Sequence, residues 1–507
     1  MNSQNPDRIN RQPFSLRTDQ LYLVIVLAGF CFFVSLVPMP PNDFWWHLKI
    51  GELIYTTGEV PSTNIFAWTL PASNPYYYAA WLGELIFFLL HKIGSLELVI
   101  FSRNLLAGLS LFLVGLEARR RSDSWRIAAL VTAIACLMIT NNLPVRTQQW
   151  AWLPFIAFFS LLSRYSEKAL PSRTLLLCPF LMVFWVNVHG SYVLGLLIIA
   201  LFVLGESIRK VLRLDDPLPW KDIRWLILVG IATGLAILVN PRFFGIFGYV
   251  SNLLSDKSIQ AFIEEWQSPT PQGIANTVFF ASILLLIAAL AYTRYRLKPT
   301  ELLIIAVFLW LAWGGQRSVV WYGMAVMPIL ARLISHLPIP LPKFQPARNW
   351  VNVGIAFLLF VPVFLVQPWF VEKFPLPETY WDQVHRNSPA GPLISIATPI
   401  DAAEYLKSKS GGNLFNELGQ GSYLIWAVPD QGVFIDPRIE LYPYEQWEDY
   451  IHISQGTQYN SILERYQADR ILLDIELQDH LASTLGDDPT WSLEYEDERA
   501  QIWLKKH

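Results

Sequence analysis

Charged residues are scarce in this sequence: Asp, Glu, Lys and Arg make up 16% of its 507 residues, and the formal net charge is −3. Without a basic surplus there is no electrostatic field for nucleic acid. The sequence also lacks a glycine-rich phosphate loop and the Cys/His spacing of a zinc site. Its three cysteines, Cys31, Cys136 and Cys178, all lie in apolar runs, so they predict no disulfide framework.

Hydrophobic residues, by contrast, make up 53% of the chain, and 21 Trp, 20 Tyr and 31 Phe are among them. This composition predicts a polytopic α-helical membrane protein. Several apolar runs are shorter than the roughly 20 residues of a straight span, which is tolerated where span ends are buried in protein or line a cavity. We expect about eleven transmembrane helices, in the runs 21–39, 96–116, 125–140, 150–163, 174–188, 191–208, 223–239, 277–293, 301–313, 318–335 and 350–370.

The loops between these runs alternate in their content of Lys and Arg. By the positive-inside rule the basic loops and the N-terminal tail 1–20 are cytoplasmic. The intervening loops, and the segment from 371 onward, are then expected on the outer face of the inner (plasma) membrane. The basic residues are Arg8, Arg11, Arg17, Arg119–Arg121, Arg164, Lys168, Arg173, Arg209, Lys210, Arg213, Lys221, Arg224, Arg294, Arg296, Lys298, Arg332, Lys343 and Arg348.

The outer loop 40–95, which begins PPNDFWWHLKIGELIYTTG, follows the first span and carries the first candidate for a functional residue. Asp43 comes directly after the apolar run, where a carboxylate facing lipid is costly. If a helix follows, Asp43 and His47 share one face, one turn apart. The alternative is that Asp43 only caps this helix while its tryptophans form an aromatic belt. Residues 82–93, which include Glu84, are too few to cross and predict a second interfacial helix.

Six polar clusters, including the Asp43 loop, fall at span ends on the predicted outer side. Ionisable side chains there cost free energy unless they pair or contact a ligand. Each taken alone also fits a helix-end anchor or a structural ion pair. Their convergence on one face favours a binding site, and the candidate substrate-binding residues are His47, Arg146, His189, Arg242, Glu265 and Arg317.

From about residue 371 the composition becomes that of a small soluble α/β domain, 371–507. We expect helices at Ile400–Lys407 and from Glu445 to Gln467. Strands are predicted at 413–416, 422–427, 432–436, 470–474, 491–495 and 500–504. The turn GQGS and the stretch FIDPRIELY, with Asp436 and Arg438, fit either a ligand site or a structural ion pair.

This layout resembles the GT-C superfamily of membrane glycosyltransferases, which includes the aminoarabinose and mannosyl transferases that use polyprenyl- or dolichyl-phosphate sugars. The resemblance covers nearly the whole chain and is closest to an uncharacterised bacterial branch. It rests on a D-x-WWH-x-x-x-G loop, an N-x-HG turn, an NP-x-x-x-G turn, an EW pair and an FIDPR-like segment, here Asp43–Gly51, Asn187–Gly190, Asn240–Gly245, Glu265–Trp266 and Phe434–Arg438.

The resemblance implies an inverting transfer of a sugar from a polyprenyl-phosphate donor to a glycan, lipid or protein acceptor at the outer face of the bilayer. Asp43 matches the position of the expected general base, and Glu84 is a second carboxylate nearby. Arg146 or Arg317 is expected to clamp the donor phosphate. Many relatives carry a second acidic residue two positions before this Asp, as a D-x-D pair. Here that position is Pro41, so no metal ligands are predicted and a divalent metal is doubtful. The alternative is a non-catalytic transporter or lipid-binding assembly protein with the same frame.

Overall fold

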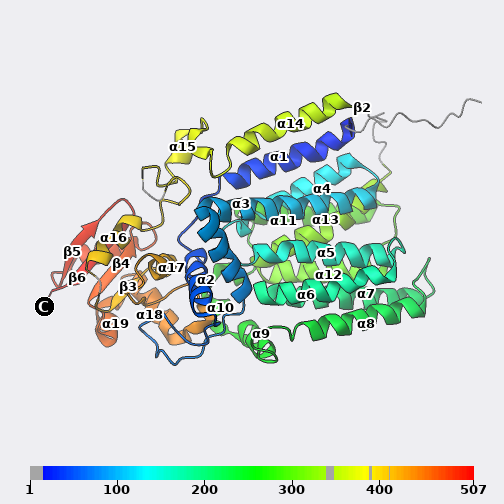
Figure 1. Ribbon diagram of the computed structural model, residues 1–507. Helices are drawn as coiled ribbons and strands as arrows, with labels where there is room; N and C mark the ends of the chain where they lie inside the picture. Colours follow the sequence, from blue (N-terminus) through cyan, green and yellow to red (C-terminus); the bar gives the residue numbers. More distant parts are fainter. Residues whose placement is uncertain (1–14, 339–346, 388–390, 410, 507) are drawn as a thin grey trace, which may run out of the picture.

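The computed structural model describes residues 15–338, 347–387, 391–409 and 411–506. Its largest part is a bundle of helices that run side by side (Figure 1), and each of the predicted apolar runs contains one of them. Two strands, β1 (Leu16–Arg17) and β2 (Arg348–Asn349), pair antiparallel and join the starts of the first and last of these helices. The bundle helices are α1 (Leu21–Ser35), α3 (Trp81–Ser122), α4 (Trp125–Met138), α5 (Gln149–Ser166), α6 (Leu177–Val188), α7 (Val193–Val211), α8 (Trp220–Ala236), α11 (Gly273–Tyr292), α12 (Pro299–Gly314), α13 (Val319–Ser335) and α14 (Trp350–Leu365).

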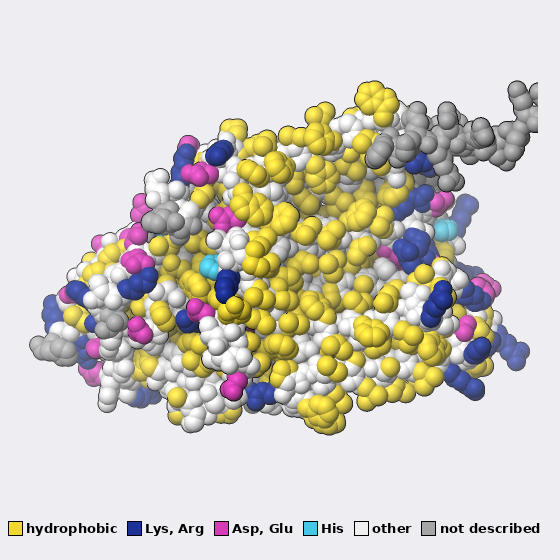
Figure 2. All heavy atoms as spheres, viewed as in Figure 1, with side chains coloured by type: hydrophobic (Ala, Val, Ile, Leu, Met, Phe, Trp, Pro, Cys, Tyr) yellow, Lys and Arg dark blue, Asp and Glu magenta, His cyan; other side chains and the backbone are white. Residues whose placement is uncertain are grey.

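The chain is a polytopic helical membrane protein. Within the described residues, five helical stretches are long and apolar enough to cross a membrane, and four shorter helices are apolar as well. Hydrophobic side chains cover the middle of the bundle, as Figure 2 shows. Large apolar residues of the bundle helices, such as Phe180 and Leu284, are exposed, which suits contact with lipid tails.

Basic side chains gather at the end of the bundle away from the C-terminal domain (Figure 2). Several belong to a buried ion network in which Arg121 and Arg332 both contact Glu301, with N···O distances of 2.9 and 3.0 Å. These arginines end α3 and α13, so the network ties helix ends together. The predicted cytoplasmic residues Arg8, Arg11 and Lys343 lie outside the described residues.

At the opposite end lie the short helices α2 (Phe44–Thr57), α9 (Gly245–Ser255), α10 (Lys257–Phe262) and the first part of α3 (Figure 1). Helix α3 is broken at Gly94 and Ser95, whose dihedral angles are not helical, so the short helix predicted at 82–93 is the part before the break. A Cβ atom on Gly51 would lie 2.2 Å from the backbone oxygen of Glu84. Glycine is therefore what allows α2 to approach α3 so closely.

The C-terminal domain packs onto this end of the bundle around a four-stranded sheet of order β3-β4-β6-β5. The pair β3 and β4 is parallel and the other pairs are antiparallel. Its strands are β3 (Leu414–Asn416), β4 (Arg470–Asp474), β5 (Trp491–Glu496) and β6 (Ala500–Lys505). Its helices are α15 (Glu378–Trp381), α16 (Ile400–Ser408), α17 (Leu418–Ala427), α18 (Tyr444–Ser454), α19 (Tyr459–Tyr466) and α20 (Asp479–Asp487).

Three of the predicted elements in this domain are wrong. The run 422–427 lies in helix α17, because the Glu417 side chain accepts a hydrogen bond from the backbone N–H of Gln420 and starts a helix there. The run 432–436 is irregular except for a bridge between Val433 and Ala67 of the outer loop. The helix predicted from Glu445 to Gln467 is two helices, separated by a turn at residues 455–458.

Candidate functional site

Asp43 stands at the N-cap of α2, directly after the loop that leaves α1. Its side chain makes no capping hydrogen bond, so capping does not explain the residue. The carboxylate instead faces the loop between α4 and α5, where Asp43 Oδ2 lies 2.8 Å from Arg146 Nε. The Asp43 side chain is 20% exposed, which leaves it open to a cavity described below.

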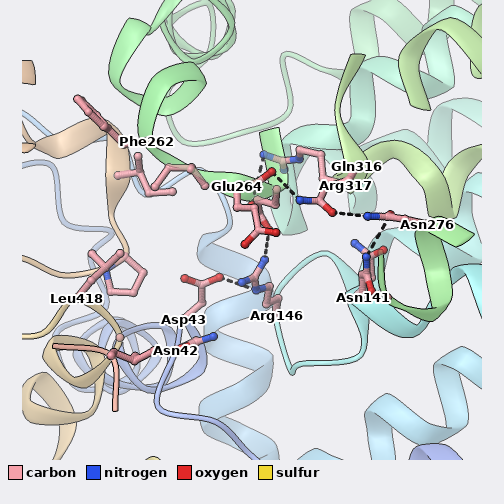
Figure 3. A pocket seen from close by; sticks show the side chains of 18 of the residues that line it. Asn42, Asp43, Asn141, Arg146, Phe262, Glu264, Asn276, Gln316, Arg317 and Leu418 are labelled. Atoms are coloured by element: carbon pink, nitrogen blue, oxygen red, sulfur yellow. Dashed lines mark hydrogen bonds and ion pairs between the residues drawn. The ribbon is translucent and has the colours of Figure 1, made fainter. Parts of the chain in front are cut away.

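Arg146 is the centre of a cluster of four ionisable side chains (Figure 3). Besides Asp43 it binds Glu265, which lies in the short turn of helix before α11. The second oxygen of Glu265 is 3.8 Å from Arg317 Nη1. The guanidinium of Arg317 in turn lies 4.1 Å from the centre of the Trp266 ring. Arg146 thus contacts the carboxylates of both Asp43 and Glu265, and Arg317 contacts that of Glu265.

Burial shapes the protonation of this cluster. Removal from water raises the pKa of Asp43 above its ordinary 3.8, and this outweighs the opposite effect of Arg146. The pKa of Glu265 is lowered, because Arg146 and Arg317 together outweigh its burial. Asp43 is therefore the better proton acceptor of the two carboxylates.

His47 and Glu84 form a second polar pair beside this cluster. His47 Nδ1 lies 2.9 Å from Glu84 Oε1, and both residues are buried. Burial holds the pKa of His47 well below its usual value, so the imidazole is neutral. The second oxygen of Glu84, Oε2, has no hydrogen-bond partner among the described residues. One oxygen of Glu84 is thus fixed, and the other is left for a ligand.

Two cavities meet at the Asp43 cluster. The first, which we call the helix cavity, has a volume of about 630 Å³. The second, which we call the amide cavity, has a volume of about 770 Å³. Asp43, Arg146, Glu265 and Arg317 line both cavities, so these side chains stand between the two. Both volumes are in the roughly 300–1,000 Å³ range of small-molecule sites.

The helix cavity has one apolar end and one polar end. Its apolar end is formed by residues of α7, α9, α12 and α13: Val193, Leu194, Leu197, Val250, Leu253, Trp310, Leu311 and Trp321. Its polar end is formed by the outer loop, the α4–α5 loop and the C-terminal domain: Trp46, His47, Tyr76–Tyr78, Glu84, Thr147, Gln148, His189, Tyr249 and Glu440. A ligand with one apolar and one polar part would fit a cavity with this lining.

The amide cavity lies between the membrane bundle and the C-terminal domain. Its bundle side carries carboxamide and ionisable side chains, several of which Figure 3 shows. Its other side is formed mainly by apolar residues of the C-terminal domain and α10. The remaining lining residues are Asn42, Asn141, Asn142, Phe262, Ile263, Glu264, Gln272, Gly273, Asn276, Gln316, Glu417, Leu418, Gly419, Pro437, Ile439 and Leu477.

Solved structures of membrane glycosyltransferases share this architecture. AglB, an oligosaccharyltransferase from Archaeoglobus fulgidus solved with an inhibitory peptide and a dolichol-phosphate, matches with a TM-score of 0.53 at 12% identity, over 90% of this chain and 70% of that one. ArnT from Cupriavidus metallidurans in the apo state matches with a TM-score of 0.50 at 14% identity, over 95% and 97%. The chain has the GT-C fold. No protein-family model matches the sequence, and a search of curated proteins gives no match.

Within the GT-C fold, most of the predicted site residues are brought together. His189 lines the helix cavity beside Asp43 and bonds Ser191, and burial lowers its pKa to about 3. Arg242 is the exception, since it lines neither cavity. It donates to the backbone oxygen of Pro61 and lies 5.5 Å from the centre of the Tyr77 ring. Arg242 thus braces the outer loop of the GT-C fold.

The C-terminal domain supplies a site residue that the sequence did not single out. Glu440 accepts hydrogen bonds from Tyr76 at 3.2 Å and Tyr249 at 3.3 Å in the polar end of the helix cavity. Burial raises its pKa. Its neighbours Asp436 and Arg438 were the residues noted in the sequence, and they form a fully buried ion pair. The tyrosine triplet in the outer loop was the available sequence signal.

Among the described residues, no group of three or more His, Cys, Asp or Glu side chains is arranged to hold a metal ion. Around Asp43 the nearest partner is the guanidinium of Arg146, which already occupies one carboxylate oxygen.

Proposed function

We infer that this protein transfers a sugar from a polyprenyl-phosphate donor to an acceptor hydroxyl, with Asp43 as general base. The observation that carries this inference is the position of Asp43 between two cavities, beside two arginines. One cavity suits an amphipathic donor and the other an acceptor. The GT-C fold supports this function, and one structure with this fold, AglB, contains a dolichol-phosphate.

The helix cavity is the proposed donor site. Its apolar end, between α7, α9, α12 and α13, suits the first isoprene units of a lipid chain. Arg317 lines the same cavity, and the donor phosphate is proposed to lie beside it. Arginine stays charged at any physiological pH and binds phosphate oxygens in pairs. Gly314 and Gly315 line the same place and leave room for a headgroup.

The polar end of the helix cavity is the proposed site of the sugar ring. Trp46, Tyr76 and Tyr249 contribute aromatic side chains to its lining. Glu84 Oε2 and Gln148 Nε2 are buried polar atoms without partners among the described residues. Leaving such atoms unpaired costs about 1–3 kcal/mol each. Sugar hydroxyl groups would satisfy both atoms.

The reaction then follows from the arrangement. The acceptor hydroxyl, entering from the amide cavity, gives its proton to Asp43 while its oxygen attacks the anomeric carbon. The bond between that carbon and the phosphate oxygen breaks, and the lipid phosphate leaves with the electron pair. Arg317 and Arg146 neutralise the charge that develops on the phosphate. Attack from the side opposite the leaving group inverts the anomeric configuration.

Arg146 also links donor binding to the base. In the structure its guanidinium contacts the carboxylates of Asp43 and Glu265. A donor phosphate would compete for this guanidinium, and Asp43 would then lose the positive neighbour that lowers its pKa. Donor binding would make Asp43 a stronger base at the moment when the acceptor needs one.

We also propose which side of the membrane the site faces and how the chain is divided into domains. The basic helix ends lie at the opposite end of the bundle from α2 and the C-terminal domain (Figures 1 and 2), so by the positive-inside rule the Asp43 site and the proposed domain 371–507 face the outside. The proposed membrane domain is 21–370, and its outer loop is 40–95. The membrane is then the inner (plasma) membrane.

The test measures transfer of sugar from a panel of polyprenyl-phosphate hexoses and pentoses to a mixture of glycan, lipid and peptide acceptors by the purified protein in lipid nanodiscs. A positioned base contributes about 10²–10⁴-fold to such a step, so Asp43→Asn should lower turnover by that order. Because Asn keeps the shape of Asp, donor binding should persist. Asp382→Asn, at an exposed position outside both cavities, is the matched control. Equal turnover by wild type and Asp43→Asn would end the general-base assignment, and no wild-type turnover on any donor would favour a transporter or scaffold.

A further inference from the structure

The amide cavity is rich in carboxamide side chains that are linked in a row. Asn141 Nδ2 donates to Asn276 Oδ1 at 3.4 Å, and Asn276 Nδ2 donates to Gln316 Oε1 at 2.8 Å. Gln316 Nε2 then donates to the backbone oxygen of Glu264 at 2.7 Å. Figure 3 shows this row beside the Arg146 cluster. The row fixes the orientation of each amide, so that the remaining donors and acceptors of the amides are presented in set directions.

Asn142, next to this row, has a buried acceptor without a partner. The residue is 8% exposed and lines the cavity. Its Nδ2 donates to Gln148 Oε1 at 3.4 Å, whereas its Oδ1 has no hydrogen-bond partner among the described residues. An unpaired buried acceptor costs about 1–3 kcal/mol. A hydroxyl donor on a bound ligand would remove that cost.

The charges of the cavity argue against an anionic ligand. Asp43, Glu264, Glu265 and Glu417 line it, and the basic side chains among its lining residues are Arg146 and Arg317. Both arginines already face carboxylates of the cluster. A phosphorylated lipid headgroup or another anion would meet an excess of negative charge here.

The wall opposite the amides is apolar. Phe262, Leu418, Ile439 and Leu477 form much of it. Sugar rings present hydroxyl groups around their edges and C–H groups on their faces. Carboxamides both donate and accept, as hydroxyls do, and the apolar wall suits the C–H faces.

Peptides fit this cavity less well than sugars. One common way to bind a peptide is to pair its backbone with an exposed strand edge. The lining residues all come from loops, turns and helices, and none lies in a strand. No strand edge in the wall of the cavity is therefore available for pairing with a peptide backbone.

We propose that the amide cavity binds a neutral saccharide, whose hydroxyl at the Asp43 end is the acceptor of the transferred sugar. This proposal rests on the function inferred above, which it narrows from an acceptor of any class to an uncharged glycan. Asn142 and the Asn141–Asn276–Gln316 row hold its hydroxyls. The apolar wall of the C-terminal domain packs against the ring faces.

Binding is tested first, without a donor. Neutral mono- to tetrasaccharides of glucose, mannose, galactose and N-acetylglucosamine are titrated into the full-length protein in nanodiscs, followed by calorimetry. At least one series should bind, and Asn142→Leu and Gln272→Leu should each weaken binding by about tenfold, the effect of one or two lost hydrogen bonds. Gln272 is exposed at the cavity rim, so its replacement does not threaten folding. Gln383→Leu, an exposed amide outside the cavity, is the matched control and should bind normally.

Transfer is tested next, with a labelled donor and three acceptor classes: the neutral saccharides, a serine- and asparagine-containing peptide mixture, and vesicles with an anionic phospholipid. Label on the saccharide supports the proposal. Label on the peptide or the lipid alone overturns it and leaves the glycosyltransferase function standing. Saccharide binding that the cavity variants weaken, without donor turnover, supports the cavity and counts against the transferase. Absence of both saccharide binding and saccharide transfer overturns the proposal.

Discussion

At the scale of single residues, Asp43 is defined by two opposing effects on its carboxylate. Burial raises its pKa and Arg146 lowers it. A general base works only when deprotonated, so turnover should fall as the pH drops through this raised pKa. Arg146→Gln removes the lowering effect in the donor-free protein, so it should move the acidic limb of the kcat/KM–pH profile, which reports the free enzyme, upward by about one unit or more.

The measurement is sugar release over a pH series for wild type and Arg146→Gln, with donor binding followed in parallel. Arg317 stays charged throughout the series and keeps its role toward the phosphate. An acidic limb that stays in place, or moves to lower pH, in Arg146→Gln would show that the titrating group is not Asp43.

Arg317 differs from Arg146 because its guanidinium is held by a long ion pair and a ring face rather than by a close carboxylate. Arg317→Lys keeps the charge and loses the planar fork. We expect donor affinity to fall by roughly tenfold or more, with thermal stability little changed. Arg242→Lys, on the same side of the molecule but outside both cavities, is the control. Unchanged donor binding in Arg317→Ala would transfer the phosphate-binding role to Arg146.

At the scale of elements, the site depends on the close packing of α2 against the first part of α3. A Cβ on Gly51 would meet the backbone oxygen and carbon of Glu84 at 2.2 and 2.8 Å. Alanine favours helices by about 1 kcal/mol over glycine, but this clash is with backbone and must move α2. Gly51→Ala should therefore destabilise the protein by about 1–3 kcal/mol and disturb the His47–Glu84 pair.

Thermal unfolding in detergent and donor turnover would measure this effect. Gly29→Ala in α1 is the matched control, since nothing lies within 4 Å of a Cβ placed there. If Gly51→Ala were as stable and active as Gly29→Ala, the close contact of α2 with α3 would not be what positions Glu84.

The outer loop is held in place by the C-terminal domain. Met39 exchanges backbone hydrogen bonds with Leu393 and Ser395, and the Trp46 backbone N–H donates to Ser422 Oγ at 3.1 Å. These contacts lie on either side of Asp43 in the sequence. The domain therefore fixes the position of Asp43 as well as forming one wall of the amide cavity.

At the scale of the whole molecule, the testable property is sidedness. The positive-inside rule places the Arg119–Arg121 end of α3 in the cytoplasm and the C-terminal domain outside. An export-dependent reporter fused after residue 507 should be active, and the same reporter fused at residue 121 should be inactive. A cytoplasm-dependent reporter should give the opposite pattern. Activity of the cytoplasmic reporter after residue 507 would overturn the topology and the proposed outer site.

The helices of the membrane bundle could be predicted from the amino-acid sequence. Apolar runs of this length must satisfy their backbone groups internally, so they form helices wherever they occur. The sequence also identified Asp43, Arg146, Glu265 and Arg317 as candidate site residues. Ionisable side chains at span ends cost free energy unless they form ion pairs or bind a ligand. The strands 470–474 and 500–504 were also predicted correctly, from short apolar runs bounded by turn residues.

The contacts of the candidate site residues became known only from the three-dimensional structure. The hydrophobic pattern of residues 422–427 did not distinguish a helix from a strand. Helix α17 forms there because the Glu417 side chain caps its N-terminus. Nor did the sequence show that Asp43 pairs with Arg146, or that Glu440, almost 400 positions away in the chain, shares a cavity with Asp43. Contacts between distant segments depend on how whole surfaces pack, and this packing also excluded Arg242 from the site and created the two cavities that meet at Asp43.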